Sequence, residues 1–152
     1  MSDSPQSNSA GVTLSRLQII LYSVAALLCV VGLAEAAYLT VLNLTGETAV
    51  CGGSPDCFRV LGSAYAKIGR IPVAGLGALA YFAAFSCAIF ALFGYALARK
   101  FFVIVIAAMF AFTFWLLYVQ AFLLHAFCRY CLFSAALIFL LTGIVVINPP
   151  RH

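Results

Sequence analysis

Cys128 and Cys131 are separated by two residues and lie where two long apolar runs meet. Thiols at this spacing can close a small, reducible disulfide ring, and the spacing often lowers the pKa of the first cysteine. A disulfide that opens and closes at the edge of a membrane indicates electron exchange rather than scaffolding. Such a pair needs an electron donor on one side and an electron acceptor on the other.

A second pair, Cys51 and Cys57, encloses the turn-rich sequence Gly-Gly-Ser-Pro-Asp. It is either a reaction partner of the first pair or a static disulfide. A zinc site made from all four thiols is the main chemical rival, but such sites favour two short-spaced pairs in a tetrahedral cage. The five-residue interval and the membrane-edge position of the other pair fit that cage poorly, so we expect no metal site.

The composition identifies a membrane protein of one domain. Of the 152 residues, 66% are hydrophobic and 8% are charged, whereas soluble proteins have roughly half and a quarter. The net charge of +4 comes from scattered basic residues with no dense run, so binding to nucleic acid is not expected. Cys29 and Cys87 lie inside apolar runs, where a free cysteine acts as a small hydrophobe.

Four apolar runs are long enough to cross a bilayer, which takes about 20 helical residues. We expect spans at residues 17–44, 73–98, 101–124 and 127–147, with Arg99-Lys100 as the whole turn between the second and the third. Residues 1–15 are predicted to be a disordered cytoplasmic tail that is not a signal peptide. A membrane domain then covers residues 16–148, and residues 149–152 form a second tail. The fold class is therefore an all-α bundle of four transmembrane helices.

Alternating helix directions bring the two cysteine pairs to one face of the membrane. The first connection carries Cys51 and Cys57, and residues 58–65 within it are predicted to form a short amphipathic helix on the membrane surface. The third connection carries the other pair. Basic residues are equally numerous on both faces, so they do not fix the orientation. The tight Arg99-Lys100 turn resists translocation, and disulfides persist outside the cytoplasm, so we place the cysteine face outside.

Two ionisable residues near the cysteines have two interpretations each. Glu35 lies toward the cysteine end of the first span, where a carboxylate is costly. It is interpreted as an interfacial or packing residue in preference to a proton-handling one. His125 precedes Cys128 by three residues, and we interpret it as an interfacial residue in preference to a base that tunes the thiolate.

The pattern resembles the vitamin K epoxide reductase family in its bacterial form. Cys51-x5-Cys57 in the first connection, Ser63 six residues later, and Phe127-Cys128-Arg129-Tyr130-Cys131 before the fourth span carry the resemblance. Ile71-Pro72-Val73-Ala74-Gly75 also looks like bacterial members. The similar region covers residues 17–147, and the order of the two pairs separates it from other four-helix disulfide generators linked to quinones.

The resemblance implies a membrane thiol–disulfide oxidoreductase that supports disulfide formation in exported proteins. Its active-site pair is Cys128 and Cys131, with Cys131 facing a quinone of the ubiquinone, menaquinone or plastoquinone type. Cys51 and Cys57 resemble the shuttle pair, which takes electrons from a thioredoxin-like protein. Ser63 resembles a hydroxyl that assists catalysis beside the quinone.

Two positions differ from the vertebrate pattern. Ala135 occupies the place of a tyrosine four residues beyond the last cysteine, and Val73-Ala74 occupy the region of an asparagine. These three positions are expected at the quinone, but epoxide reduction is not carried over to this chain. Since few residues follow the fourth span, the electron donor is expected to be a separate periplasmic protein. The resemblance places the chain in a bacterial inner membrane, in contact with its lipids and quinone pool and with the active cysteines on the periplasmic side.

The alternative that we keep is a four-helix membrane protein without enzymatic activity. Its disulfides would then be structural, or its four cysteines would hold a metal. Thiol trapping with and without a quinone distinguishes these possibilities, because only an enzyme cycles the Cys128–Cys131 pair between two redox states.

Overall fold

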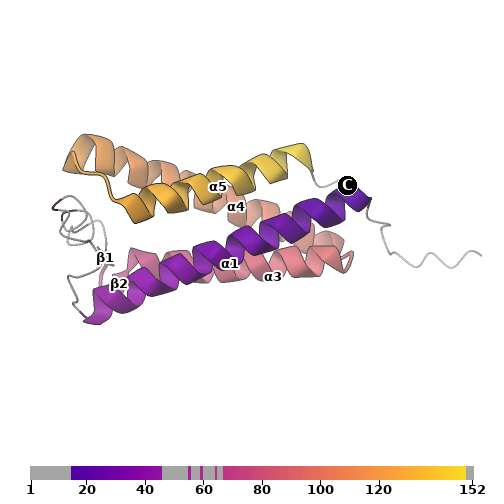
Figure 1. Ribbon diagram of the computed structural model, residues 1–152, viewed down its shortest axis with the longest axis horizontal. Helices are drawn as coiled ribbons and strands as arrows, with labels where there is room; N and C mark the ends of the chain where they lie inside the picture. The colour runs from indigo at the N-terminus through magenta and orange to yellow at the C-terminus, as the bar shows by residue number, and fades with distance from the viewer. Residues whose placement is uncertain (1–14, 46–54, 56–58, 60–63, 65–66, 150–152) are drawn as a thin grey trace, which may run out of the picture.

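The computed structural model describes residues 15–45, 55, 59, 64 and 67–149. The elements in order are α1 (Arg16–Thr45), β1 (Lys67–Ile68), β2 (Ile71–Pro72), α3 (Val73–Leu92), α4 (Ala96–Tyr118), the π-helix η3 (Val119–Leu124) and α5 (Arg129–Ile147). Figure 1 shows the long helices side by side as an antiparallel bundle. The prediction of an all-α protein with four membrane spans is confirmed.

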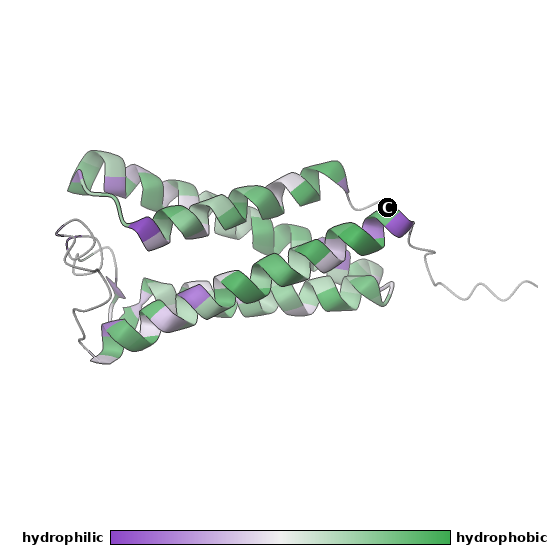
Figure 2. Ribbon diagram, in the orientation of Figure 1, coloured by the Kyte–Doolittle hydropathy of each residue, from purple (hydrophilic) through white to green (hydrophobic). Residues whose placement is uncertain are grey.

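Four helical segments are long and apolar enough to cross a membrane. They are Arg16–Thr45, Val73–Leu92, Ala96–Leu124 and Arg129–Ile147. Large apolar side chains cover their outer surface, as at Leu27, Leu79 and Phe114, each of which is at least 65% exposed. Figure 2 shows the strongly hydrophilic residues mostly toward the ends of the helices. An outer surface of apolar side chains is stable in contact with lipid. The helical backbone is stable there too, because it pairs its own polar groups within the helix.

The turn between α3 and α4 lies at residues 93–95, so the predicted Arg99-Lys100 turn is wrong. Gly94 has φ 90°, which glycine adopts without steric cost, and its N–H donates to the carbonyl of Ala91 at 3.1 Å. Arg99 and Lys100 are part of α4 instead. The two charged residues correctly indicated that this part of the chain is near the membrane surface. The backbone, however, reverses direction at Gly94, because glycine permits a positive φ.

The two ends of the bundle differ in what they carry. Figure 1 shows residues 125–128 and the β1–β2 hairpin at one end, and the α3–α4 turn and the end of α5 at the other. The predicted alternation of helix directions is therefore seen. Cys51, Cys57 and Ser63 lie outside the described residues, as does most of the predicted surface helix at 58–65.

Small residues let α1 and α3 pack closely. Ala25, Ala36, Ala84 and Ala88 are all buried between the helices of the core. At Gly32 an added Cβ would overlap the ring of Tyr81, which is 2% exposed. Small residues allow this close approach in membranes, where helix association depends on van der Waals packing. The absence of a side chain at Gly32 thus makes room for the ring of Tyr81 against α1.

Candidate functional site: a thiol pair beside an apolar cavity

Cys128 is the residue that precedes the first turn of α5. Its backbone is extended, with φ −91° and ψ 127°, and its side chain is completely buried. The N–H of Leu132 donates to the carbonyl of Cys128 at 3.0 Å, which begins the helix. Cys131 follows within the first turn and is half-buried, so the two thiols stand together at a helix N-terminus. The predicted start of this span at Phe127 is two residues early.

The Cys128 thiol is an activated one. Its pKa is lowered from 9.0 to about 6, first because the Cys131 thiol donates a hydrogen bond to it, and also because the backbone N–H groups of Tyr130 and Cys131 point at it. Burial acts in the opposite direction and is outweighed. Unpaired N–H groups at the start of a helix favour negative charge. At neutral pH Cys128 is therefore mostly a thiolate, which is the form that attacks disulfides.

Gln120 holds the segment that carries the thiols. It is 3% exposed, and its side-chain Oε1 accepts the N–H of Cys128 at 3.2 Å. Its side chain also hydrogen-bonds the sulfur of Cys131. Its backbone carbonyl accepts the N–H of Ala126 at 3.1 Å. One glutamine near the start of η3 therefore binds both cysteines through its side chain and the segment before them through its backbone.

Gln120 belongs to a short π-helix that ends at a residue in the left-handed conformation. Residues Val119–Leu124 form a π-helix, and His125 closes it in the left-handed conformation, with φ 48° and ψ 36°. Such π-turns occur frequently at functional sites, and histidine tolerates the left-handed region better than most residues. His125 is exposed. Its observed role is to reverse the chain so that residues 126–128 can return to the bundle.

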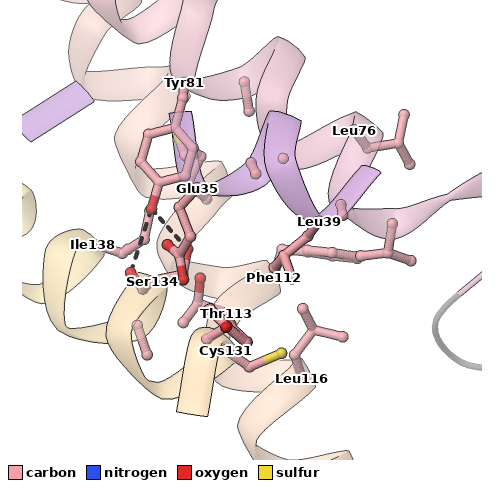
Figure 3. A pocket seen from close by; sticks show the side chains of 18 of the residues that line it. Glu35, Leu39, Leu76, Tyr81, Phe112, Thr113, Leu116, Cys131, Ser134 and Ile138 are labelled. Carbon is pink, nitrogen blue, oxygen red and sulfur yellow. Dashed lines mark hydrogen bonds between the residues drawn. The ribbon is translucent and has the colours of Figure 1, made fainter. Parts of the chain in front are cut away.

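A cavity of about 610 Å³ lies beside Cys131. Residues from all four spans line it, together with Pro72 ahead of α3, and apolar side chains form most of its wall. Figure 3 shows Leu39, Leu76, Phe112 and Leu116 around the space, with the sulfur of Cys131 at its edge. This volume is in the range of pockets that hold small organic ligands.

A small polar group interrupts the apolar wall. The hydroxyl of Tyr81 and Oγ of Ser134 are 2.9 Å apart, and the Tyr81 hydroxyl also donates to the Ser134 carbonyl at 3.3 Å. Glu35 lies next to them in Figure 3. Both of its carboxyl oxygens are buried, and neither has a hydrogen-bond partner in the described part of the chain.

The predicted quinone-site residues can now be located. Cys131, Ala135, Val73 and Ala74 all line the one cavity, although they come from α3 and α5. Ser63 belongs to the undescribed segment. The structure therefore brings together every predicted residue of this group that it describes.

Sequence reasoning missed Gln120, Tyr81 and Ser134. Gln120 carried a usable signal, because an amide inside an apolar span is costly unless it has a partner. It is also separated by only eight residues from Cys128, the group it binds. Tyr81 and Ser134 gave no comparable signal, since hydroxyl groups are common in membrane helices and their pairing depends on how α3 and α5 are rotated.

The arrangement suits thiol chemistry coupled to a lipid-soluble oxidant. A buried thiolate and its neighbouring thiol can open or close a disulfide, and the cavity beside them is apolar enough for an aromatic ring. The Glu35 carboxyl, whose oxygens have no partner in the described part of the chain, can donate a hydrogen bond to a ligand carbonyl in that cavity when it is protonated. The residues present therefore fit a quinone.

Comparison with known proteins agrees with this chemistry. The model of the vitamin K epoxide reductase family matches residues 23–146, which is most of the chain. A search of curated proteins finds no match. Because the family match covers most of the chain, extends into all four spans and includes the Cys128–Cys131 pair, the chain belongs to the vitamin K epoxide reductase family, whose members are membrane thiol–disulfide oxidoreductases linked to quinones.

Proposed function

We propose that the protein passes electrons from a separate thioredoxin-like protein to a membrane quinone through two cysteine pairs. The partner dithiol reduces the Cys51–Cys57 disulfide and leaves the partner oxidised, so that it can introduce disulfides into exported proteins. The observation that carries the proposal is the position of Cys131 at the edge of an apolar cavity, one helical turn from the activated Cys128.

Each thiol step conserves electrons. The Cys57 thiolate attacks the sulfur of Cys128, which breaks the Cys128–Cys131 bond and releases Cys131 as a thiolate. Cys51 then attacks Cys57, which restores the Cys51–Cys57 disulfide and leaves the Cys128–Cys131 pair reduced. The quinone supplies an acceptor for two electrons and two protons. When Cys128 and Cys131 close their disulfide again, those electrons leave the protein.

The same scheme determines the orientation that we propose. Residues 1–15 and 149–152 would be cytoplasmic tails, and the bundle of residues 16–148 would place its cysteine end on the periplasmic side of a bacterial inner membrane. Disulfides persist in that compartment. The hairpin end of the bundle, which bears Cys128 at the start of α5, would then face the thioredoxin-like donor.

Replacement of one cysteine tests the proposal. Purified protein with Cys131→Ala should form no quinol from a reduced thioredoxin-like donor, because the remaining thiol cannot close the disulfide. Cys87→Ala is the matched control, since Cys87 packs on the core away from the cavity lining, and it should keep normal turnover. If Cys131→Ala still reduces the quinone, the assignment is wrong.

Thiol trapping separates the enzyme from the structural alternative. In the wild type, addition of a quinone should convert the trapped Cys128–Cys131 pair from dithiol to disulfide, and addition of a reduced donor should reverse this. A static disulfide would remain oxidised in both conditions.

A further inference from the structure

Glu35 is the one acidic residue among the residues that the structure describes. The whole chain has four acidic residues, and the other three are Asp3, Glu47 and Asp56. Glu35 lies in α1 and lines the cavity beside Cys131. The thiol mechanism described above makes no use of it. A carboxyl group in the middle of a membrane protein is expensive to retain, which makes it a candidate for function.

Among the described residues, those around Glu35 in the cavity include no cation. Tyr81 faces it from α3, while Cys131 and Cys128 face it from the start of α5. The polar residues that α4 and η3 add to the same cavity are Thr113 and Gln120, and both are neutral. An unpaired carboxylate in an apolar medium carries a large desolvation cost. The apolar surroundings and the lack of a neighbouring cation therefore favour the protonated form of Glu35, which is neutral.

The protonated carboxyl has a proton to donate, and no residue that the structure describes accepts it. Neither oxygen of Glu35 has a hydrogen-bond partner in the described residues, although Tyr81 and Ser134 lie close by. Tyr81 and Ser134 are engaged with each other at 2.9 Å. The carboxyl group is thus left free on the side where a ligand would lie. A buried polar group without a partner is destabilising, and a hydrogen bond to a ligand carbonyl removes that cost.

We propose that Glu35 is a catalytic residue that gives its proton to one oxygen of the quinone as the Cys128–Cys131 disulfide closes. The inference rests on the proposed function, because it concerns the same cavity and the same electron acceptor. It adds a source for one of the two protons that quinol formation requires.

The protons and electrons balance in this scheme. Closing the disulfide removes two electrons from the thiol pair, and both go to the quinone. Cys128, already a thiolate, has lost its proton to solvent at the membrane surface, and one proton returns from solvent to the quinone oxygen farther from Glu35. Glu35 protonates the nearer oxygen, and the resulting carboxylate takes the proton that Cys131 gives up. The net reaction is two thiols and a quinone giving a disulfide and a quinol, with Glu35 protonated again.

Glu35→Gln tests this with little change in shape. The amide can still donate a hydrogen bond to a quinone carbonyl, but it cannot transfer a proton. We expect kcat for quinol formation to fall about 100-fold or more, which is the usual contribution of general acid catalysis, while KM for the quinone stays within a few-fold. Glu35→Asp should recover part of the lost kcat. Glu47→Gln removes another carboxyl by the same change and should have no effect.

Infrared spectroscopy provides a second measurement that needs no turnover. In protein without quinone, a carbonyl band of a protonated carboxyl that shifts in heavy water should be present in the wild type and in Glu47→Gln. The band should be missing in Glu35→Gln. An ionised Glu35 in this experiment, or a kcat for Glu35→Gln equal to that of the wild type, would overturn the proposal.

The result also separates this inference from the function on which it rests. If the wild type reduces no quinone, the proposed function fails. If the wild type is active, Cys131→Ala is inactive and Glu35→Gln is fully active, the function stands and only the role of Glu35 is refuted. If KM for the quinone rises as much as kcat falls, Glu35 is a binding group and not the proton donor.

Discussion

The low pKa of Cys128 depends first on the Cys131 thiol, so removing that thiol should make Cys128 less reactive. We compare Cys131→Ala, which lacks a donor, with Cys131→Ser, which keeps a hydroxyl donor at the same position. A hydrogen bond to a charged group contributes about 1.5–3 kcal/mol, which corresponds to a change of about 10- to 150-fold in the balance of thiol and thiolate. The backbone N–H groups of residues 130 and 131 remain in both variants.

At pH 6 the wild-type Cys128 is about half thiolate, since its pKa is about 6. The loss calculated above leaves about 0.7–9% of Cys128 as thiolate in Cys131→Ala, so the rate of alkylation should fall by about 5- to 75-fold. The rate should then rise with pH and approach a plateau well above pH 6. Cys131→Ser should lie between this variant and the wild type.

Alkylation of the reduced protein can be followed by mass spectrometry of tryptic peptides. Cleavage after Lys100 and after Arg129 gives a peptide in which Cys128 is the sole cysteine, and Cys131 falls in the next peptide. The rate for Cys128 is measured from pH 5 to pH 10. If both variants keep the wild-type profile, with an inflection near pH 6, the Cys131 thiol is not the cause of the low pKa and the account of the activated thiol is refuted.

Two further substitutions test the supports of the site. Gln120→Met removes the acceptor of the buried Cys128 N–H, at a cost of about 1–3 kcal/mol, and should slow quinol formation by about 5- to 150-fold. Gln18→Met makes the same change at the other end of the bundle, where Gln18 bonds Asn148, and equal rates in the two variants would contradict a positioning role. Gly32→Ala forces the Tyr81 ring to move, at about 1–3 kcal/mol for overpacking, and should lower the melting temperature in detergent. Gly143→Ala is its control because an added Cβ there meets nothing within 4 Å, and an equal loss of stability in both would show that the Gly32–Tyr81 contact is unimportant.

Much of the fold could be predicted because lipid imposes a strict rule on the backbone. A chain in hydrocarbon must pair its polar groups internally, so a long apolar run forms a helix. The predicted first span, residues 17–44, is within one residue of α1 at each end. The turn between the second and third spans was misplaced because hydropathy measures the cost of each side chain in lipid. It carries no information on backbone direction, which at Gly94 is decided by a positive φ.

The cavity could be predicted only in part. In a soluble helix the apolar face points to the core, but here both the lipid-facing and the core-facing surfaces are apolar. Leu39 is 7% exposed and Leu44 is 70% exposed on the same helix, and their residue type does not distinguish them. The rotation of each helix, and with it the meeting of Tyr81, Ser134 and Glu35, is determined by packing such as that at Gly32. The thiol pair was predictable because its chemistry depends on spacing within one short segment.

The return of the chain after η3 affects which molecules can reach the sulfur of Cys128. Figure 1 shows α4 and the segment after it extending past the first turn of α5, so that Cys128 is set back from the tip of the bundle. With a fully buried side chain, this sulfur is shielded from direct contact with a bulky folded domain. A narrow polypeptide segment or a small reagent can approach such a sulfur more easily than a folded domain can. Under the proposed function, this burial would protect the quinone-linked thiol pair from reaction with unrelated thiols.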